Sequence, residues 1–325
     1  MRRSGGKTSA AKAASGNGAV DAAEPNRAPG ASKPARNVDL SVWSPTHALA
    51  PGLHLVATPI GNLGDITLRG LWVLRGVDRV LCEDTRVTGR LLARFGIDAT
   101  LEPYHDHNAD RVRPAILDRL RRGERLALVS DAGTPLVSDP GYRLVRDALA
   151  EGMPVTGAPG PSAAIAALTL SGLPPDAFLF AGFLPPRQAA RRKALAGWRD
   201  LAATLIFYEG PSRLADSLAD MAETLGDREA AVARELTKLH EEIRRGRLAA
   251  LAEYYRTAGK PKGEIAVVVA PPGTCPAAAL DDGEIDRRLG AALARLSLRD
   301  AAARIADETG LPRREIYRRA LALKR

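Results

Sequence analysis

Two clusters of polar residues in the amino-terminal half of the chain have the types and spacing needed for acid–base chemistry. The first is CEDTR, where Glu83, Asp84 and Arg86 follow a short apolar run, and the second is YHDHN, which contains His105 and Asn108. A carboxylate or an imidazole can take a proton from a hydroxyl group, while an arginine or an amide can orient the reacting groups. The first cluster also permits a structural interpretation, in which a carboxylate caps a helix and forms a surface ion pair.

The histidines of the second cluster raise the question of a metal site. His105 and His107 flank Asp106, but neither a cysteine nor a third histidine lies near them in the sequence. Hydrogen-bonding roles are more common than metal ligation for such a group, so we predict no metal. The chain also lacks the G-x-S-x-G and H-E-x-x-H patterns of several hydrolase classes.

Three glycine-rich turns could hold a ligand against their backbone. TPIGN begins at Thr58, SDAGTPLVSDPG at Ser130 and GAPGPSAA at Gly157, and each turn follows a predicted strand. The carboxyl ends of parallel strands lie at one edge of a sheet, so the turns predict one shared pocket. The first turn lacks the G-x-G-x-x-G pattern of dinucleotide sites, and the chain lacks the G-x-x-x-x-G-K-[ST] pattern of ATP sites. Neither of these ligands therefore has its usual sequence support. Ser162, in the third turn, is placed to cap the next helix.

Short apolar runs alternate with amphipathic segments from Leu53 onward, which is typical of an α/β fold with a largely parallel sheet. The first predicted strands cover residues 53–58, 79–84, 125–131 and 153–160, and the helices between or beside them cover residues 67–76, 86–96, 113–123 and 141–152.

The pattern changes near FLFAGFLPP, where two prolines end a strand and a basic helical segment follows. Further strands are predicted at residues 204–210, 229–236, 241–248 and 263–270, with one clear helix at residues 213–226. One crossover helix among several strands favours a mixed or antiparallel second sheet.

The net charge of +9 lies in the two ends of the chain. Residues 1–48 contain 7 basic and 3 acidic residues, residues 284–325 contain 11 and 6, and the region between contains 29 of each. The first segment is rich in small residues and proline and predicts a disordered basic arm. The last segment predicts two helices around Gly310–Pro312, either a helix-turn-helix unit or a dimerisation or capping element with a solvated basic face.

These patterns divide the chain into four predicted parts. They are a basic arm (residues 1–48), an amino-terminal α/β domain (49–175), a second α/β domain that closes the pocket (176–278) and a carboxyl-terminal helical RNA-binding segment (279–325). The two cysteines, Cys82 and Cys275, form no C-x-x-C pair, which favours a reducing cytoplasm. No apolar run approaches the roughly 20 residues needed to span a membrane.

The ordered motifs resemble the ribosomal RNA small-subunit methyltransferase I family, within the tetrapyrrole-methylase-like class. The resemblance extends from about Leu53 to the carboxyl terminus and rests on TPIGNLGDITLRG, HDHN, LVSDAGTPLVSDPGYRLV, APGPSAAIAALTLSGLP, GFLPP, TLIFYEGPSR, ARELTKLHEE and KGEIAVVV. It implies a homodimer whose two α/β domains enclose S-adenosylmethionine. It also implies methyl transfer to the ribose 2′-hydroxyl of a decoding-centre cytidine in 16S rRNA, within the small ribosomal subunit.

The resemblance also implies which residues form the site. The cofactor contacts are expected from Pro59, Ile60, Asp131, Ala132, Gly133, Thr134, Ser162 and Tyr208, with backbone from Ala233 to Leu236. The basic residues expected to meet RNA are Arg187, Arg191, Arg192, Lys193, Arg313, Arg314, Arg318 and Arg319. Glu83, Asp84 and His105 are the candidates for a base, with Arg86 and Asn108 as orienting groups, and the sequence does not choose among them.

Two alternatives remain open at this point. A small-molecule methylase acting on a tetrapyrrole would share the fold, but it would not need a basic helical appendage. A ribosome-binding factor without enzymatic activity could retain the cofactor fold and leave rRNA unmodified.

Overall fold

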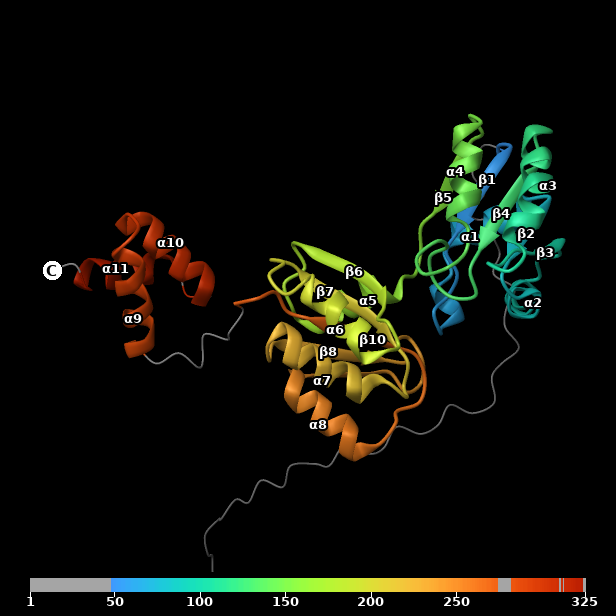
Figure 1. Cartoon of the computed structure of the whole chain (residues 1–325). Coiled ribbons are helices and arrows are strands. Elements are labelled where there is room, and N and C mark those ends of the chain that lie inside the picture. The colour runs from blue at the N-terminus through green and yellow to red at the C-terminus, as the bar shows by residue number, and fades with distance from the viewer. Residues whose placement is uncertain (1–47, 274–281, 310, 312, 324–325) are drawn as a thin grey trace, which may run out of the picture. The chain divides into compact units, whose positions relative to one another are not determined.

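The computed structural model describes residues 48–273, 282–309, 311 and 313–323 of the 325-residue chain. The predicted disordered arm therefore lies outside the described residues, apart from Ala48, and so do Cys275, Gly310 and Pro312. Figure 1 shows a first sheet, a second sheet and a group of three helices, which we describe in turn. Among the described residues, no helix is long and apolar enough to cross a membrane.

The first sheet is parallel, with the strand order β3-β2-β4-β1-β5. Its strands are β1 (Gly52–Val56), β2 (Arg79–Cys82), β3 (Leu101–Pro103), β4 (Arg125–Val129) and β5 (Val155–Ala158). The chain leaves β1 toward β2, whereas it leaves the neighbouring β4 toward β5, in the opposite direction along the sheet. This reversal is a topological switch point, where open parallel sheets bind their ligands.

Four helices cover the two faces of the first sheet (Figure 1). They are α1 (Leu68–Gly76), α2 (Thr85–Arg94), α3 (Ala109–Arg121) and α4 (Tyr142–Ala150). The first two pack on one face, where Leu74 and Leu92 meet Val80, and the last two pack in the cluster that contains Leu81. Val80 and Leu81 are adjacent in β2 and point to opposite faces, as the two-residue period of a strand requires.

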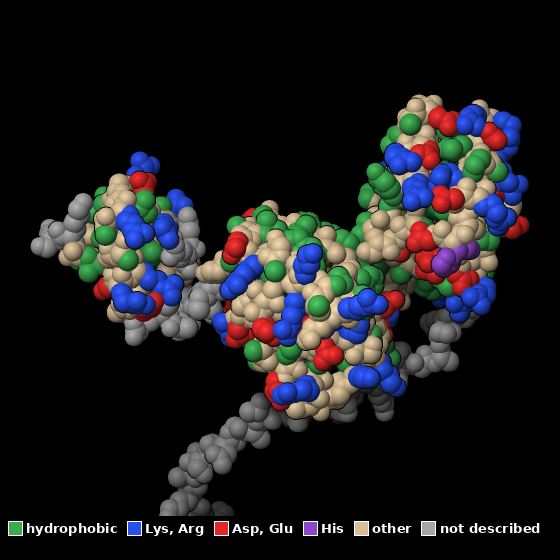
Figure 2. Space-filling view, viewed as in Figure 1, with side chains coloured by type: hydrophobic (Ala, Val, Ile, Leu, Met, Phe, Trp, Pro, Cys, Tyr) green, Lys and Arg blue, Asp and Glu red, His purple; other side chains and the backbone are tan. Residues whose placement is uncertain are grey.

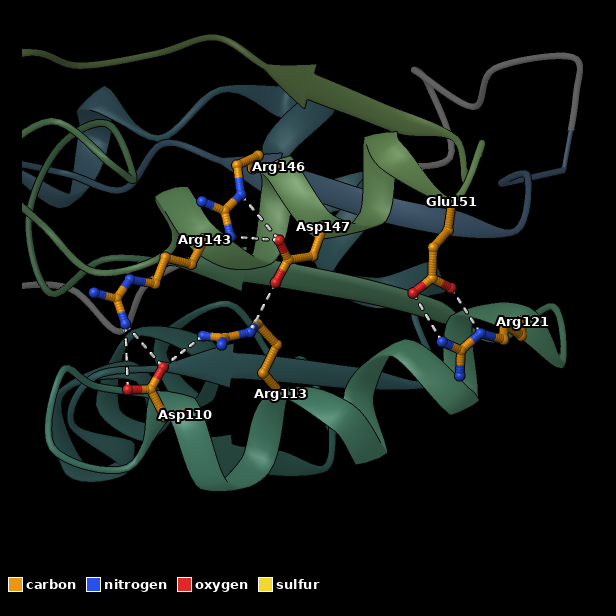
Figure 3. A network of polar contacts seen from close by, with 7 residues as sticks. All are labelled: Asp110, Arg113, Arg121, Arg143, Arg146, Asp147 and Glu151. Atoms are coloured by element: carbon orange, nitrogen blue, oxygen red, sulfur yellow. Dashed lines mark hydrogen bonds and ion pairs between the residues drawn. The ribbon is translucent and has the colours of Figure 1, made fainter.

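Charged side chains also link α3 to α4 (Figure 3). Arg113 contacts Asp147 at 2.9 Å and Asp110 at 2.8 Å, and Arg121 contacts Glu151 at 2.7 Å. The Arg121–Glu151 pair is partly exposed, and pairs open to solvent typically contribute only about 0–1 kcal/mol each. The Arg113–Asp147 pair is more covered and lies above the apolar cluster that α3 and α4 share.

The second sheet is mixed, with the strand order β6-β7-β10-β8-β9. Its strands are β6 (Phe178–Phe183), β7 (Thr204–Glu209), β8 (Glu229–Arg234), β9 (Glu242–Arg247) and β10 (Ile265–Val269). Only β6 and β7 pair in parallel, and the other neighbours are antiparallel. The predicted mixed sheet is therefore present.

Helices cover both faces of the second sheet (Figure 1). One face packs against α5 (Ala163–Ser171), and the other packs against α6 (Gln188–Ala196), α7 (Leu214–Leu225) and α8 (Leu248–Ala258). The sequence prediction did not include α8. It extended a strand through Leu248, but this residue begins the helix and is buried with Leu251 and Tyr255 on one helical face.

Helix α5 shows why the domain boundaries remain predictions. It lies before the predicted boundary at residue 175, yet its residues Ala164, Ala167 and Leu168 are buried in the cluster of the second sheet. Arg245 of β9 donates hydrogen bonds to the carbonyls of Leu170 and Ser171, at the carboxyl end of α5.

The carboxyl-terminal part consists of three helices with a core of their own. They are α9 (Asp282–Leu293), α10 (Leu298–Thr309) and α11 (Arg313–Leu323). Leu289, Ile305 and Ile316, one from each helix, are buried together in this core. The predicted pair of helices corresponds to α10 and α11, and α9 is an addition that the sequence prediction lacked. Ser297 begins α10 by accepting a hydrogen bond from the backbone N–H of Asp300.

Candidate cofactor site

The turns after β1, β4 and β5 are joined by hydrogen bonds at the switch point. The backbone N–H of Thr58 donates to the carbonyl of Gly133 at 2.9 Å, and the N–H of Gly133 donates back at 3.0 Å. The Thr58 hydroxyl donates to the carbonyl of Ser130 at 2.9 Å, and the Thr134 hydroxyl donates to that of Pro161 at 3.0 Å. The three glycine-rich turns thus lie together, as their positions after parallel strands predict.

A cavity of about 390 Å³ is lined by these turns and by loops of the second sheet. Its volume is in the range of small-molecule sites. Of the eight predicted cofactor contacts, the cavity is lined by Ile60, Asp131, Ala132, Gly133, Thr134, Ser162 and Tyr208. Pro59 is not among the lining residues. Ser162 occupies the N-cap position of α5, but its side chain makes no capping hydrogen bond.

The charged residues that line the cavity are all acidic. They are Asp131, Asp139, Glu209 and Glu264, and no lysine, arginine or histidine of the described residues lines it. Arg213 contacts Glu209 at 2.7 Å, and Lys238 contacts Glu264 at 2.9 Å, so these two carboxylates are neutralised from outside the lining. Among the described residues, neither aspartate forms an ion pair. The cavity therefore favours a ligand that carries positive charge.

Asp139 is a site residue that the sequence analysis did not single out, although it lies in the quoted SDAGTPLVSDPG motif. Burial and, next, the negative charge of Glu83 raise the pKa of Asp139 to about 6. Burial also raises the pKa of Asp131, and the charge of Asp84 acts in the same direction. A signal for Asp139 was present in the sequence, because Ser138-Asp139 repeats the Ser130-Asp131 pair that begins the turn.

The backbone around the cavity is strained. Among the described residues, the non-glycine residues with positive φ are Leu136 (72°), Ser138 (66°), Glu235 (51°) and Thr237 (64°). The first two lie in the loop after β4 and the other two in the loop between β8 and β9, and both loops line the cavity. Each such residue typically costs about 1–3 kcal/mol, and strain of this kind concentrates at functional sites.

The first turn also contacts the loop between β8 and β9. The backbone N–H of Asn62 donates to the Thr237 hydroxyl at 3.0 Å. A Cβ atom on Gly61 would lie 2.4 Å from Cγ of Lys238 and 3.0 Å from the carbonyl oxygen of Leu236. Only glycine therefore allows this approach of the two segments.

We expect Gly61→Ala to weaken cofactor binding. The added methyl group would push the first turn away from the loop, and overpacking of this kind typically costs about 1–3 kcal/mol. Ile60 and Leu236, which line the cavity, would move apart with them. Gly89→Ala is a matched control, since its Cβ would meet only Leu101 at 3.5 Å. Calorimetric titration with the cofactor compares the two variants, and equal affinities would contradict this account.

The stability of an Asp139→Asn variant should depend on pH in a defined direction. The folded-state pKa of about 6 lies above the ordinary value of 3.8, so the folded chain binds a proton more tightly than the unfolded chain. Wild-type stability therefore falls as pH rises between these values, while asparagine imitates the protonated acid throughout. We expect the variant to unfold at a higher temperature than the wild type near pH 8, and at a similar one near pH 4. Asp176→Asn, on an exposed residue, is the control, and lower stability of Asp139→Asn near pH 8 would contradict the account.

Two of the predicted catalytic residues occupy the N-cap positions of helices, and only Asp84 caps its helix with its side chain. Asp84 is the N-cap of α2, where its Oδ1 accepts a hydrogen bond from the N–H of Arg86 at 2.8 Å, and it contacts the Arg86 guanidinium at 2.6 Å. Hydrogen bonds from Arg86 lower the pKa of Asp84 to about 2. Asn108 accepts a hydrogen bond from the N–H of His105 and donates one to the carbonyl of Pro103, both at 2.9 Å.

Glu83 is a better proton acceptor than Asp84. The residue is exposed, but partial burial of its carboxyl and the negative charges of Asp131 and Asp106 raise its pKa above the usual value. The end of β2 is joined to the cavity because the N–H of Asp84 donates to Oδ1 of Asp131 at 3.2 Å. Like the other predicted catalytic residues, Glu83 does not itself line the cavity.

The histidines lie among these acidic groups, and Figure 2 shows histidine side chains beside acidic ones. The rings of His105 and His107 are 6.0 Å apart in an edge-to-face arrangement. In the part of the chain that the structure describes, no group of three or more His, Cys, Asp or Glu residues is arranged to hold a metal ion.

The basic residues predicted to meet RNA have different surroundings. Arg187 and Lys193 are exposed, but Arg191 is buried and contacts Asp220 at 2.5 Å. Arg192 contacts the same carboxylate at 2.7 Å. The prediction for Arg191 is therefore corrected, because its guanidinium holds α6 against α7 and does not reach solvent.

The basic residues of α11 lie mostly on its surface. Arg313, Arg314 and Arg318 are exposed, while Arg319 lies closer to Asp286 and Glu315, at 3.6 and 3.8 Å.

Comparison with known proteins places the chain among methylases. Residues 52–252 match the family model of Tetrapyrrole (Corrin/Porphyrin) Methylases, and residues 279–324 match the RsmI C-terminal HTH domain. A protein of Mesorhizobium japonicum called ribosomal RNA small subunit methyltransferase I is 52% identical, covering 86% of this chain and 95% of its own length. The chain belongs to the ribosomal RNA small subunit methyltransferase I family. A relative of the same name from Escherichia coli O157:H7 is 45% identical, over 83% of this chain and 94% of its own length.

Solved structures with a similar fold include the methyltransferase CobJ and diphthine synthase. Each has a TM-score of 0.53, with 20% and 18% sequence identity. The first covers 69% of this chain and 96% of its own, and the second covers 67% and 89%. The predicted fold class is thereby confirmed: a tetrapyrrole-methylase-like α/β chain with a parallel first sheet, a mixed second sheet and a carboxyl-terminal helix-turn-helix domain. This member of the methyltransferase I family is a methyltransferase.

Proposed function

We propose that the chain uses S-adenosylmethionine to methylate the ribose 2′-hydroxyl of a decoding-centre cytidine in 16S rRNA. The names of its relatives support the small-subunit rRNA as substrate. The observation that carries the choice of cofactor is the charge of the cavity, which is lined by four carboxylates and no cationic side chain. A phosphate-bearing cofactor would meet only like charge there, whereas a sulfonium is attracted.

The residues present also fit the other parts of this cofactor. Ala132 and Gly133, which has φ of +83°, line the cavity with little side-chain bulk, so an amino-acid or ribose group can come close to the wall there. Tyr208 presents an aromatic ring, edge-on to Phe180 and Phe183, that suits contact with a nucleoside base. When bound, S-adenosylmethionine supplies an electrophilic methyl group.

The chain's own residues would position the ribose and take its proton. Positioning of reacting groups can supply much of the acceleration in a displacement of this kind. Glu83 is the residue that we assign to accept the hydroxyl proton, because its pKa is raised and it acts electrostatically on Asp139 at the cavity. Asp84 and Arg86 would fix the start of α2. His105, whose Nδ1 is buried and has no hydrogen-bond partner, remains a second candidate.

The carboxyl-terminal helices would grip the RNA backbone. We expect deletion of residues 284–325 to weaken rRNA binding far more than cofactor binding, because α9, α10 and α11 share a core of their own. A less drastic variant reverses the charge of the exposed Arg314 and Arg318 together. Each lost phosphate contact should reduce the slope of log affinity against log salt by about 0.7–0.9. Filter binding at several salt concentrations measures this slope, and equal loss of rRNA and cofactor binding would assign the segment to fold support.

A homodimer in the cytoplasm is also part of the proposal. Helix α5 is mostly apolar, yet its residues Ile165 and Leu170 are exposed. A helix of this kind is usually buried. Light scattering of the purified chain would show the dimer. The cytoplasm follows from the proposed substrate, the small ribosomal subunit.

The test of the activity uses purified chain, methyl-labelled S-adenosylmethionine and small subunits from cells that lack the enzyme. Mass spectrometry should locate one 2′-O-methyl group on a decoding-centre cytidine. A labelled base or another nucleotide would refute the proposed position. Transfer to neither subunits nor free rRNA would favour the small-molecule methylase, which an absorbance titration with a porphyrinoid would support. Absence of transfer together with tight subunit binding would favour a non-enzymatic ribosome-binding factor.

A further inference from the structure

Two of the four carboxylates that line the cavity form no ion pair among the described residues. Glu209 contacts Arg213, accepts a hydrogen bond from the Ser217 hydroxyl at 2.6 Å and is buried. Glu264 contacts Lys238 at 2.9 Å. Asp131 and Asp139 have no such cation within ion-pair distance among the described residues, and Glu83 and Asp106 add further negative charge around Asp139.

The loop that carries these two aspartates cannot easily move them apart. It contains Leu136 and Ser138 in the left-handed region, and Gly141 with φ of 130°. A Cβ atom on Gly141 would lie 2.6 Å from Cδ2 of Leu128, which is buried in β4. The bridge between Thr58 and Gly133 holds the other end. The strained backbone and the repulsion between the carboxylates of Asp131 and Asp139 both destabilise the fold at this cavity. A bound cation relieves the repulsion and so stabilises the fold.

We propose that Asp131 and Asp139 make the cavity discriminate by charge, so that it binds S-adenosylmethionine more tightly than the product S-adenosylhomocysteine. This inference rests on the proposed function. On methyl transfer the ribose oxygen bonds to the methyl carbon and releases its proton to a base, while the electron pair of the broken C–S bond stays on sulfur. The cationic sulfonium thereby becomes a neutral thioether, and the attraction to the two carboxylates is lost.

The loss of this attraction favours release of S-adenosylhomocysteine from the cavity. Two ligands that share the adenosine and the amino-acid end make the same backbone contacts, so those contacts cannot tell them apart. A unit charge within several ångströms of a partly buried carboxylate changes affinity by roughly 10- to 100-fold. Discrimination of this size would keep the product from occupying the site between turnovers.

The test is calorimetric titration of the full chain with S-adenosylmethionine, S-adenosylhomocysteine and sinefungin, an analogue with an ammonium group near the position of the sulfonium. The wild type should bind both cationic ligands roughly 10- to 100-fold more tightly than the thioether. Asp139→Asn and Asp131→Asn should each reduce this preference by about tenfold, with S-adenosylhomocysteine affinity nearly unchanged. Asp139→Glu, which keeps the charge, should retain most of the preference.

Asp176→Asn is the matched control, because it removes an exposed carboxylate that does not line the cavity. It should leave the preference intact. Equal affinity of the wild type for the three ligands would overturn the inference, and so would an equal loss of all three in the asparagine variants. Failure of the wild type to bind any of them would instead refute the proposed cofactor.

Discussion

Glu83→Gln should lower the single-turnover rate of methyl transfer to small subunits by roughly 10²- to 10⁴-fold, the usual contribution of a general base. Glu83 is the stronger base of the two carboxylates in the CEDTR cluster, because burial and then the charge of Asp131 raise its pKa above the usual value, whereas Arg86 lowers the pKa of Asp84 to about 2. Glutamine has nearly the same shape but cannot accept the ribose proton. Glu83 does not line the cavity but adds negative charge around Asp139, so the affinity for S-adenosylmethionine should fall much less than the rate.

The pH profile separates this chemical role from a structural one. A base acts when it is deprotonated, so the wild-type rate should rise with pH through the raised pKa of Glu83 and then level off. The variant should lack this rise. Asp106→Asn removes a nearby exposed charge without removing the base, and its rate should remain close to that of the wild type. A Glu83→Gln rate within about threefold of the wild type would exclude the carboxylate as base and leave His105 as the candidate.

Much of the fold follows from periodicity in the sequence. The buried strands β1, β2 and β4 read as apolar runs that end at glycine-rich or polar turns, and glycines follow several helices, such as Gly172 with φ of 79° after α5. The boundaries are less predictable. Helix α3 begins at Ala109, before the predicted residue 113, because the carbonyl of Asn108 already accepts a hydrogen bond from the N–H of Val112 and Pro114 is accommodated inside the helix. These are tertiary and local hydrogen-bonding effects that periodicity does not report.

The site could be predicted in part, for a related reason. Glycine and proline mark sharp turns, so TPIGN, SDAGT and GAPGPS were visible as backbone that could meet a ligand. Asp139 was not, because its importance comes from burial and from the charges around it, which only the fold brings together. The same limit explains Arg191. A basic run suggests RNA, but the burial of one arginine against Asp220 depends on how α6 packs on α7.

Asp220→Ala should destabilise the part of the chain built on the second sheet by about 3–5 kcal/mol, the usual effect of removing one partner from a buried ion pair. Asp220 is 1% exposed and accepts hydrogen bonds from Gln188, Arg191 and Arg192. These bonds, with the Arg191 contact at 2.5 Å, keep the pKa of Asp220 below its usual value despite the opposing effect of burial. Alanine would leave the buried guanidinium of Arg191 without its counter-charge. Urea unfolding followed by tryptophan fluorescence measures the change in a background that carries Trp43→Phe and Trp72→Phe, so that Trp198, which packs against the core of this sheet, is the reporter.

Glu223→Ala is the matched control for this experiment. It lies one helical turn further along α7 and contacts only the outer arginine, Arg192, at 2.5 Å, with 63% of its side chain exposed. Its loss should change the free energy of unfolding by about 0–1 kcal/mol, as for other exposed pairs. The double variant Asp220→Leu with Arg191→Met replaces the pair by apolar groups of similar size and should recover most of the lost stability, because both buried charges are gone. If Asp220→Ala were as mild as Glu223→Ala, the pair would not be the contact that fixes α6 to α7, and Arg191 would again be available to meet RNA.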